Sequence, residues 1–258
     1  MPADKVAFIT GGSRGIGRGI AERLLADGYL VAISGRDPGK GEQALREMAA
    51  GERAIFLAAD GADQGQAERA VDGVLDHWGR VDVLVNNVGG SRGVAEVASM
   101  SDDDWGYTAD LILNSALWST RRALPGMQSA GWGRVINISS VESKRCRISG
   151  VSHYVTFKHA MNGFTRAVAA EYARCGITCN ALCPGGVETD LMTTTGRATA
   201  ESTGVTYEEF LQQYADETLT GRLVTVEEVA ALAAFLVTDL ARSITGNLIN
   251  IDGGSLPY

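Results

Sequence analysis

The sequence predicts an α/β fold of the Rossmann type: a doubly wound parallel sheet of about seven strands with helices on both faces. Three observations support it. Short apolar segments alternate with longer helical patterns along the whole chain. The apolar segments lack polar alternation, which is typical of parallel strands that are covered on both faces. A glycine-rich turn, Thr10-Gly-Gly-Ser-Arg-Gly-Ile-Gly17, follows the first of these segments.

Each apolar run of strand length is predicted as one strand of that sheet. In chain order they are Val6–Thr10, Leu30–Ser34, Ala54–Ala59, Val83–Asn86, Val135–Ser139, Ile177–Leu182 and Leu248–Ile251. Helical patterns fill the intervals: Gly17–Asp27, Lys40–Ala49, Gln64–Trp78, Asp103–Gln128, Ser152–Ala173 and Val226–Val237. This alternation implies right-handed crossovers, and ligands bind such sheets beyond the carboxyl ends of the strands.

One segment interrupts the alternation. Asp190 to Gly221 is rich in Thr, Gly and Ala and then contains a short amphipathic piece, Tyr207 to Tyr214. A long excursion after a strand end is often a lid, so we interpret 190–221 as a substrate lid, with a peripheral helical insert as the alternative. Nothing resembles a linker, so residues 1–258 are predicted to form a single domain.

Composition restricts the function. The net charge of −8 argues against a nucleic-acid or anionic-membrane partner, because both need a basic face. The start of the chain lacks a secretion signal, and the longest apolar run, Val229 to Val237, is too short to span a bilayer. Cys175, Cys179 and Cys183 match no zinc pattern and are interpreted as core residues. The sequence therefore predicts a cytoplasmic protein without a metal site.

The glycine-rich turn predicts a dinucleotide site. Gly11, Gly15 and Gly17 lie between the first strand and the first helix, where glycine permits a tight turn and a close approach of backbone N–H groups to a pyrophosphate. Such a turn alone is weak evidence. It is strengthened by Asn86-Asn87-Val88-Gly89 directly after the fourth strand.

Tyr154 and Lys158 form the second motif. They lie four residues apart on a predicted helix and therefore share one face. An ammonium ~5 Å from a phenol contributes about 3 kcal/mol at an effective dielectric constant of ~20. That energy corresponds to about two pKa units. We therefore expect Lys158 to lower the pKa of Tyr154 so that the phenol can act as an acid and a base.

With both motifs in this order, the chain resembles the short-chain dehydrogenase/reductase family over nearly its whole length, in the single-domain form similar to 3-oxoacyl-carrier-protein reductases. The matching residues are Thr10–Gly17, Asp60, Asn86–Gly89, Asn114, Ser140, Tyr154, Lys158, Pro184–Thr189 and Ile244–Gly254. The resemblance implies a nicotinamide cofactor and a homotetramer. It also implies that Ser140 binds the substrate oxygen, that Asn114 supports a proton relay, and that Lys158 also binds the nicotinamide ribose.

The predicted cofactor site combines the glycine turn with the family motifs. Its residues are Gly11, Ser13, Arg14, Gly15, Ile16, Gly17, Arg36, Asp60, Asn87, Gly89, Tyr154, Lys158, Pro184, Gly185, Val187 and Thr189. The resemblance implies that Asp60 bonds the adenine, that Thr189 binds the nicotinamide carboxamide, and that the segment after Pro184 closes over the nicotinamide.

The end of the second strand bears on the choice of cofactor. An acid there would accept both ribose hydroxyls of NAD, but this chain has Gly35 followed by Arg36, with Arg14 in the glycine turn. Two guanidinium groups suit the 2′-phosphate of NADP. Asp37 lies where an NAD-type acid is often found, although Asp37-Pro38-Gly39 is typical of a helix cap. NADP is favoured, and NAD is the alternative.

The chain departs from the family pattern in one loop. Thirteen residues separate Ser140 from Tyr154, one more than is usual in the family. The loop also carries Lys144, Arg145 and Arg147, interpreted as a solvated loop or a subunit contact. If these cations faced the cleft instead, they would favour a carboxylate, phosphate or thioester-carrier substrate.

The predicted function is hydride transfer between NADP(H) and a carbonyl or secondary alcohol of a small molecule, with Tyr154 and Lys158 as the acid/base pair. One alternative is an NAD-dependent dehydrogenase of a hydroxy acid, sugar or polyol. A more distant one is a dinucleotide-binding sensor without activity, but a pure binder has no need of an acid/base pair.

Overall fold

The chain forms one seven-stranded parallel sheet in the order β3-β2-β1-β4-β5-β6-β7, which confirms the predicted fold class. The computed structural model describes residues 5–147 and 149–256. The strands are β1 Val6–Ile9, β2 Leu30–Gly35, β3 Ala54–Ala58, β4 Val83–Asn86, β5 Gly133–Ile138, β6 Ile177–Pro184 and β7 Leu248–Ile251. The strand order reverses beside β1, because β2 lies on one side of it and β4 on the other, and this reversal opens a crevice at the carboxyl ends of the strands.

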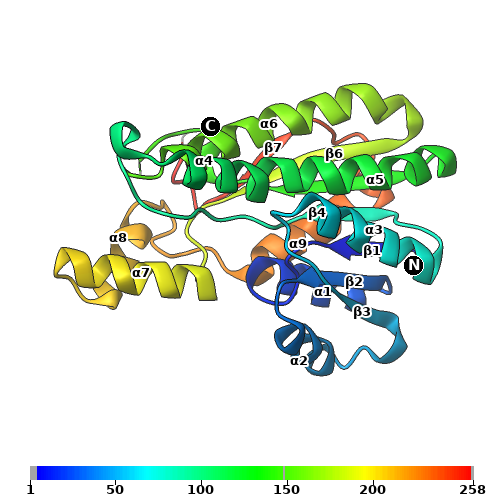
Figure 1. Cartoon of the computed structure of the whole chain (residues 1–258), viewed down its shortest axis with the longest axis horizontal. Helices are drawn as coiled ribbons and strands as arrows, with labels where there is room; N and C mark the ends of the chain where they lie inside the picture. The colour runs from blue at the N-terminus through cyan, green and yellow to red at the C-terminus, as the bar shows by residue number, and fades with distance from the viewer. Residues whose placement is uncertain (1–4, 148, 257–258) are drawn as a thin grey trace.

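Helices cover both faces of the sheet (Figure 1). They are α1 Gly15–Ala26, α2 Pro38–Met48, α3 Gln64–Trp78, α4 Asp102–Ala109, α5 Ser115–Ala130, α6 Ser152–Tyr172, α7 Asp190–Thr203, α8 Tyr207–Asp216 and α9 Val226–Leu236. Each of the two faces carries its own apolar core. Buried side chains of α1, α2 and α9 pack on one face, and those of α3, α5 and α6 pack on the other.

The central strands are buried because they are apolar on both sides, whereas β7 at one edge is only partly buried. All four residues of β1, and Val31, Ala32 and Ile33 of β2, are fully buried. Cys179 and Cys183 of β6 are free and buried, as predicted. Among the described residues, no group of His, Cys, Asp and Glu side chains is arranged to hold a metal ion. Nor does any helix in the described ranges have the length and apolarity needed to cross a membrane.

The predicted helix Asp103–Gln128 is interrupted. It consists of α4, a π-helical turn at Asp110–Asn114, and α5. Within this turn the backbone N–H of Ser115 bonds to the carbonyl of Asp110, so the turn holds one residue more than an α-helical turn. The turn contains Asn114, one of the predicted site residues.

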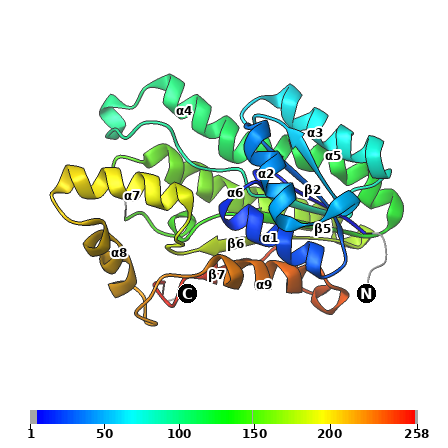
Figure 2. The same cartoon turned by 90° about the horizontal axis from the view of Figure 1, so that it is seen from below.

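The excursion at 190–221 contains more helix than its composition predicts. Its Thr-rich first half is α7, although threonine favours helices only weakly (Figures 1 and 2). Thr189 caps its first turn by accepting from the Met192 N–H, and Thr194 and Thr203 donate to carbonyls four residues earlier. The predicted amphipathic piece is α8, which begins with a capping box of Thr206 and Glu209. In both views the two helices extend beyond one end of the sheet.

Candidate active site

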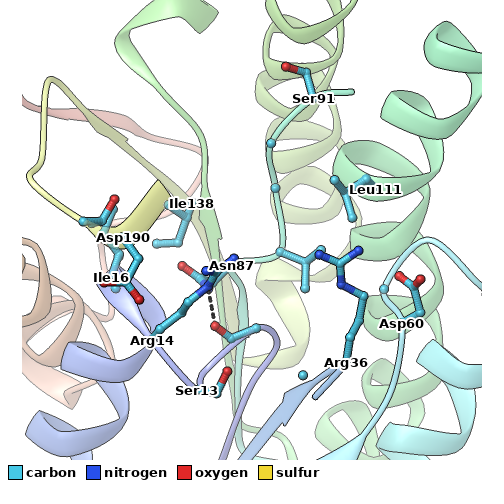
Figure 3. Close-up of a pocket in the computed structure, with 18 of the residues that line it drawn as sticks. Ser13, Arg14, Ile16, Arg36, Asp60, Asn87, Ser91, Leu111, Ile138 and Asp190 are labelled. Carbon is cyan, nitrogen blue, oxygen red and sulfur yellow. Dashed lines mark hydrogen bonds between the residues drawn. The ribbon is translucent and has the colours of Figure 1, made fainter. Parts of the chain in front are cut away.

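A cavity of about 630 Å³ lies at the carboxyl ends of the strands (Figure 3). Twelve predicted site residues line it: Gly11, Ser13, Arg14, Gly15, Ile16, Arg36, Asp60, Asn87, Gly89, Tyr154, Lys158 and Thr189. These residues come from the turns after β1, β2, β3, β4 and β6 and from helix α6, which are far apart in the sequence. The fold therefore brings the glycine turn and the Tyr154–Lys158 pair to the same cavity.

The remaining predicted residues lie outside the lining of this cavity. Pro184 is buried at the end of β6, and the Gly185 N–H bonds to the Ile251 carbonyl. Val187 packs in the core and pairs with Val224 in an isolated β-bridge. Asn114 is half-buried and donates to the Asp110 carboxylate at 2.7 Å. Pro184, Gly185, Val187 and Asn114 therefore do not line the cavity and lie behind its surface.

The glycine turn has the backbone that a dinucleotide site needs. Gly11 and Gly15 have φ values of +64° and +56°, in the left-handed region that favours glycine. Gly17 is required for a different reason, because a Cβ there would lie 2.4 Å from Nδ2 of Asn87. That amide donates to the carbonyls of Thr10 and Gly11 at 3.0 and 3.1 Å. Asn87 thus fixes the shape of the turn, and the turn fits the pyrophosphate that the sequence predicts.

The cavity wall beyond β2 is rich in cations. Arg14, Arg36 and Lys40 line it together with Asp37 and Asp60, and Figure 3 shows Arg36 beside Asp60. Asp37 is the N-cap of α2 and accepts from the Lys40 N–H at 3.2 Å, as the Asp37-Pro38-Gly39 pattern predicts. Its carboxylate is therefore engaged by its own helix, whereas the exposed Arg36 makes only a long hydrogen bond of 3.4 Å to the Tyr107 hydroxyl.

Tyr154 and Lys158 share one face of α6, as predicted. The Lys158 ammonium lies 5.7 Å from the centroid of the Tyr154 ring and donates to the Ile138 carbonyl at 2.7 Å. Because Lys158 is only 4 % exposed, burial lowers its pKa to about 8. The expectation for Tyr154 is wrong for this structure. Burial raises its pKa, a hydrogen bond with Ser140 opposes the rise, and the charge of Glu142 adds to it. Desolvation of the phenol therefore outweighs the effect of the lysine that we expected.

Ser140 lies two residues beyond Ile138, the last residue of β5, and is buried. Its Oγ accepts from the Glu142 N–H at 3.1 Å and caps the short 3₁₀ turn Val141–Ser143. The hydroxyl has one proton, and with Oγ accepting from the backbone that proton remains available for donation. Ser140 also acts on Tyr154, since its hydroxyl opposes the rise of the Tyr154 pKa. A substrate oxygen placed beside Tyr154 would therefore meet two hydroxyl donors.

Asn162 is a buried residue that the sequence analysis missed. It lies one turn beyond Lys158 on α6, and its amide donates to the Ser143 Oγ and carbonyl at 2.9 and 3.0 Å. Its Oδ1 accepts from the Ser139 hydroxyl at 3.0 Å. One amide thus bonds residues on both sides of Ser140. The i, i+4, i+8 spacing of 154, 158 and 162 was a visible signal.

The interpretation of the basic loop as solvated holds for the exposed Arg147 but not for Lys144 and Arg145, which are partly buried, and the alternative of a subunit contact stays a prediction. Lys144 is partly buried and donates to the Leu248 carbonyl and to Asn250 on β7. Arg145 bonds to Glu142 at 3.0 Å, and Arg147 pairs with Glu217 at the end of α8. These cations have acceptors within the chain because the loop folds back onto the end of α8 and the sheet edge at β7.

Comparison with known proteins gives consistent matches over the full length. A family model described as enoyl-(acyl carrier protein) reductase matches residues 11–255. D-beta-hydroxybutyrate dehydrogenase of Cupriavidus necator is 36% identical over 254 residues, covering 97% of this chain and 97% of that protein. 3beta-hydroxysteroid dehydrogenase of Mediterraneibacter gnavus is 35% identical over 269 residues, covering 99% of this chain and 96% of the other.

Solved structures give the same result. A variant of actinorhodin polyketide ketoreductase with NADPH superposes with a TM-score of 0.93 at 33% identity, covering 99% of this chain and 98% of that one. L-sorbose reductase from Gluconobacter frateurii, complexed with NADPH and L-sorbose, has a TM-score of 0.93 at 28% identity, with 99% and 98% covered.

Proposed function

Since the chain belongs to the short-chain dehydrogenase/reductase family, and is thus an oxidoreductase of hydroxyl and carbonyl groups, we propose that it reduces a ketone or oxidises a secondary alcohol with NADP(H). One observation carries the proposal. The glycine turn and the Tyr154–Lys158 pair line the same cavity, so an acid and a cofactor site face one reacting centre.

The proposed mechanism assigns one task to each side chain. A bound nicotinamide supplies or accepts the hydride. Tyr154 gives its proton to the carbonyl oxygen during reduction and takes it back during oxidation. Ser140 donates a hydrogen bond to the same oxygen and stabilises the charge that develops there. Lys158 holds the ribose of the cofactor. Its ammonium and a positively charged, oxidised nicotinamide would both favour the phenolate, against the effect of burial.

We assign Asn114 a supporting role in proton movement. It lies in the π-helical turn between α4 and α5, and such turns are frequent at functional sites. Its Nδ2 donates to the Asp110 carboxylate, which leaves the side-chain Oδ1 as an acceptor that could bind a water of the relay.

NADP is the cofactor that we propose. The proposal is supported by Arg36 and Lys40 after β2 and by Arg14 in the glycine turn, which all line the cavity, and by Asp37, which is engaged as a helix cap. Guanidinium groups bind phosphate through paired, charge-assisted hydrogen bonds. Two of the solved relatives carry NADPH, which agrees with this choice.

The test is to follow nicotinamide absorbance with NADPH and with NADH against a panel of 3-oxoacyl thioesters, cyclic ketones, keto acids and keto sugars. Turnover with NADPH is expected, and Tyr154→Phe should abolish it while leaving the Kd for NADPH unchanged. A Tyr154→Phe enzyme that keeps its rate would rule out the proposed mechanism. A preference for NADH would show that Asp37, rather than Arg36, is next to the ribose.

Three further expectations belong to this proposal. The chain works as a single domain in which 190–221 covers the substrate, it assembles into a homotetramer, and it acts in the cytoplasm. Light scattering coupled to size exclusion tests the assembly, because a tetramer has four times the mass of the 27.2 kDa chain. Slower proteolysis within 190–221 when cofactor and substrate are bound would support the lid.

A further inference from the structure

A second cavity lies apart from the proposed active site, between α6, the turn that follows Ser140 and the start of β7. Its volume is about 630 Å³, and its lining includes Lys144, His159, Gly163 and Arg166. None of the described residues that line it also lines the cavity of Tyr154 and Lys158. The second cavity is therefore a separate site, and the proposed reaction gives it no task.

The charged side chains of this second cavity are all basic. Lys144, His159 and Arg166 line it, and the described part of the lining contains no Asp or Glu. The cavity at the strand ends differs, because three aspartates lie among its cations. The chain as a whole has a net charge of −8. Basic side chains gathered without acids in such a chain create a local positive potential that attracts anions.

The two permanent cations of the cavity keep charge and donors for a ligand. Arg166 is exposed, and no described carboxylate pairs with it. Its guanidinium carries five N–H donors in a planar fork. The Lys144 ammonium donates to the Leu248 carbonyl at 2.8 Å and to the side chain of Asn250. Both of these acceptors are neutral, so the positive charge of Lys144 is not balanced and its third proton remains for another acceptor.

His159 and Arg166 flank an open space on α6. Positions 159, 163 and 166 share one face of the helix, and a Cβ on Gly163 would have no atom within 4 Å. The Nδ1 of His159 bonds to the Val155 carbonyl at 2.9 Å. Because a carbonyl only accepts, Nδ1 carries the proton, and Nε2 is left for a ligand and donates to it when the ring is protonated. Gly163 thus leaves room for a ligand between two basic side chains.

We propose that this second cavity binds a phosphate group, either as free phosphate or as part of a small phosphorylated molecule. A guanidinium binds phosphate through paired, charge-assisted hydrogen bonds, and an ammonium adds a point charge. A dianion would balance both Arg166 and Lys144, whereas a single carboxylate would balance only one of them. The site is distinct from the place proposed for the 2′-phosphate beside Arg36. The inference does not depend on the proposed function.

The test is to measure the unfolding temperature against the concentration of inorganic phosphate, with NaCl added to keep the ionic strength constant. For a Kd of about 1 mM, 10 mM phosphate should raise the unfolding temperature by roughly 3–6 °C, and the rise should saturate. Glycerol 3-phosphate, titrated in the same way, separates the two sources of the group. Tighter binding of the ester assigns the site to a phosphorylated molecule, and equal binding assigns it to phosphate itself.

Three variants locate the bound phosphate. Arg166→Ala should raise the Kd by about tenfold or more, because hydrogen bonds to charged groups contribute at least that much. Gly163→Leu fills the open space beside His159 and should also block binding, while leucine favours the helix over glycine. Arg174→Ala is the matched control, since this exposed arginine lies just beyond the end of α6 and outside the cavity. Its Kd should equal that of the wild type.

Phosphate binding that persists in both Arg166→Ala and Gly163→Leu would overturn the inference, as would a rise that does not saturate. Complete loss in Arg36→Ala would also overturn it, because the phosphate would then occupy the cofactor cavity. A change of assembled mass in Arg166→Ala would show that a carboxylate of a second subunit, rather than phosphate, meets this arginine. Each of these results leaves the proposed function intact, because none of them measures turnover.

Discussion

Replacing Asn162 by leucine removes the amide that bonds both sides of Ser140. The change keeps the size of the side chain roughly constant, but it removes two hydrogen bonds to Ser143 at 2.9 and 3.0 Å and one from Ser139 at 3.0 Å. All of these groups are buried, with Ser139 at 3 % and Ser143 at 2 % exposure. Water therefore cannot replace the lost partners without a rearrangement of the loop.

The expected magnitude follows from those contacts. A buried polar group left without a partner costs about 1–3 kcal/mol, and part of that is recovered by relaxation. We therefore expect Asn162→Leu to lower the free energy of unfolding by about 2–4 kcal/mol. Ser140 lies in the segment that relaxes, between Ser139 and Ser143. We therefore expect its hydroxyl to move away from the substrate oxygen. A displacement of about 1 Å at a reacting centre can reduce kcat by roughly a hundredfold.

A double-mutant cycle separates this positioning effect from lost stability. Asn162→Leu and Ser140→Ala should each lower kcat, and the double variant should be little worse than Ser140→Ala alone, because both act through one hydroxyl. The Kd for NADPH should not change. Asn180→Leu is the control: this equally buried amide on β6 bonds to the Ile244 carbonyl at 2.8 Å and to the Asn247 N–H at 3.1 Å. Its effect on kcat should be small and additive with Ser140→Ala. Additive losses for Asn162→Leu would refute the positioning role.

Three other substitutions test separate parts of the structure. Burial lowers the pKa of Lys158 from 10.5 to about 8, so between these values the native state holds fewer protons and stability rises with pH. Lys158→Met should therefore abolish turnover. At pH 7 it should also raise the free energy of unfolding in urea by about 1–3 kcal/mol, after allowance for the lost bond to Ile138, and this gain should shrink as the pH rises from about 8 to 10.5. A gain independent of pH would contradict this account. Arg36→Ala should raise the Kd for NADPH by about 10- to 100-fold and hardly affect NADH in fluorescence titrations, whereas equal losses would place the 2′-phosphate elsewhere. Arg147→Ala removes the ion pair to Glu217 and should speed proteolysis within 190–221 without changing NADPH binding; an unchanged digestion rate would show that the pair does not hold the lid.

Patterns local in sequence predicted the fold and the main parts of the site. Apolar runs without alternation predicted the buried strands, and β7 has the predicted bounds Leu248–Ile251. Glycines at positions that need positive φ predicted the turn after β1, and a four-residue spacing put Tyr154 and Lys158 on one face. In each case the determining interaction lies within a few residues, so the order of residue types is sufficient.

The helix α7 shows where local reasoning fails. A Thr-rich segment favours helix weakly, yet Asp190–Thr203 is helical because Thr189 caps its first turn and its Gly196 packs against Phe210 of α8. The second contact depends on where the chain places α8. Propensity alone carries no information about it.

The sequence by itself determined the sheet, the glycine turn after β1 and the placement of Tyr154 and Lys158 on one helix face. Only the tertiary structure decided the charge around them. The sequence indicates a solvated loop or a subunit contact for Lys144, Arg145 and Arg147, whereas the fold gives them partners on β7, at Glu142 and at Glu217. It also buries Tyr154, so desolvation raises a pKa that the neighbouring lysine was expected to lower. Electrostatic effects depend on distance and burial, which are set by the contacts between segments far apart in the chain.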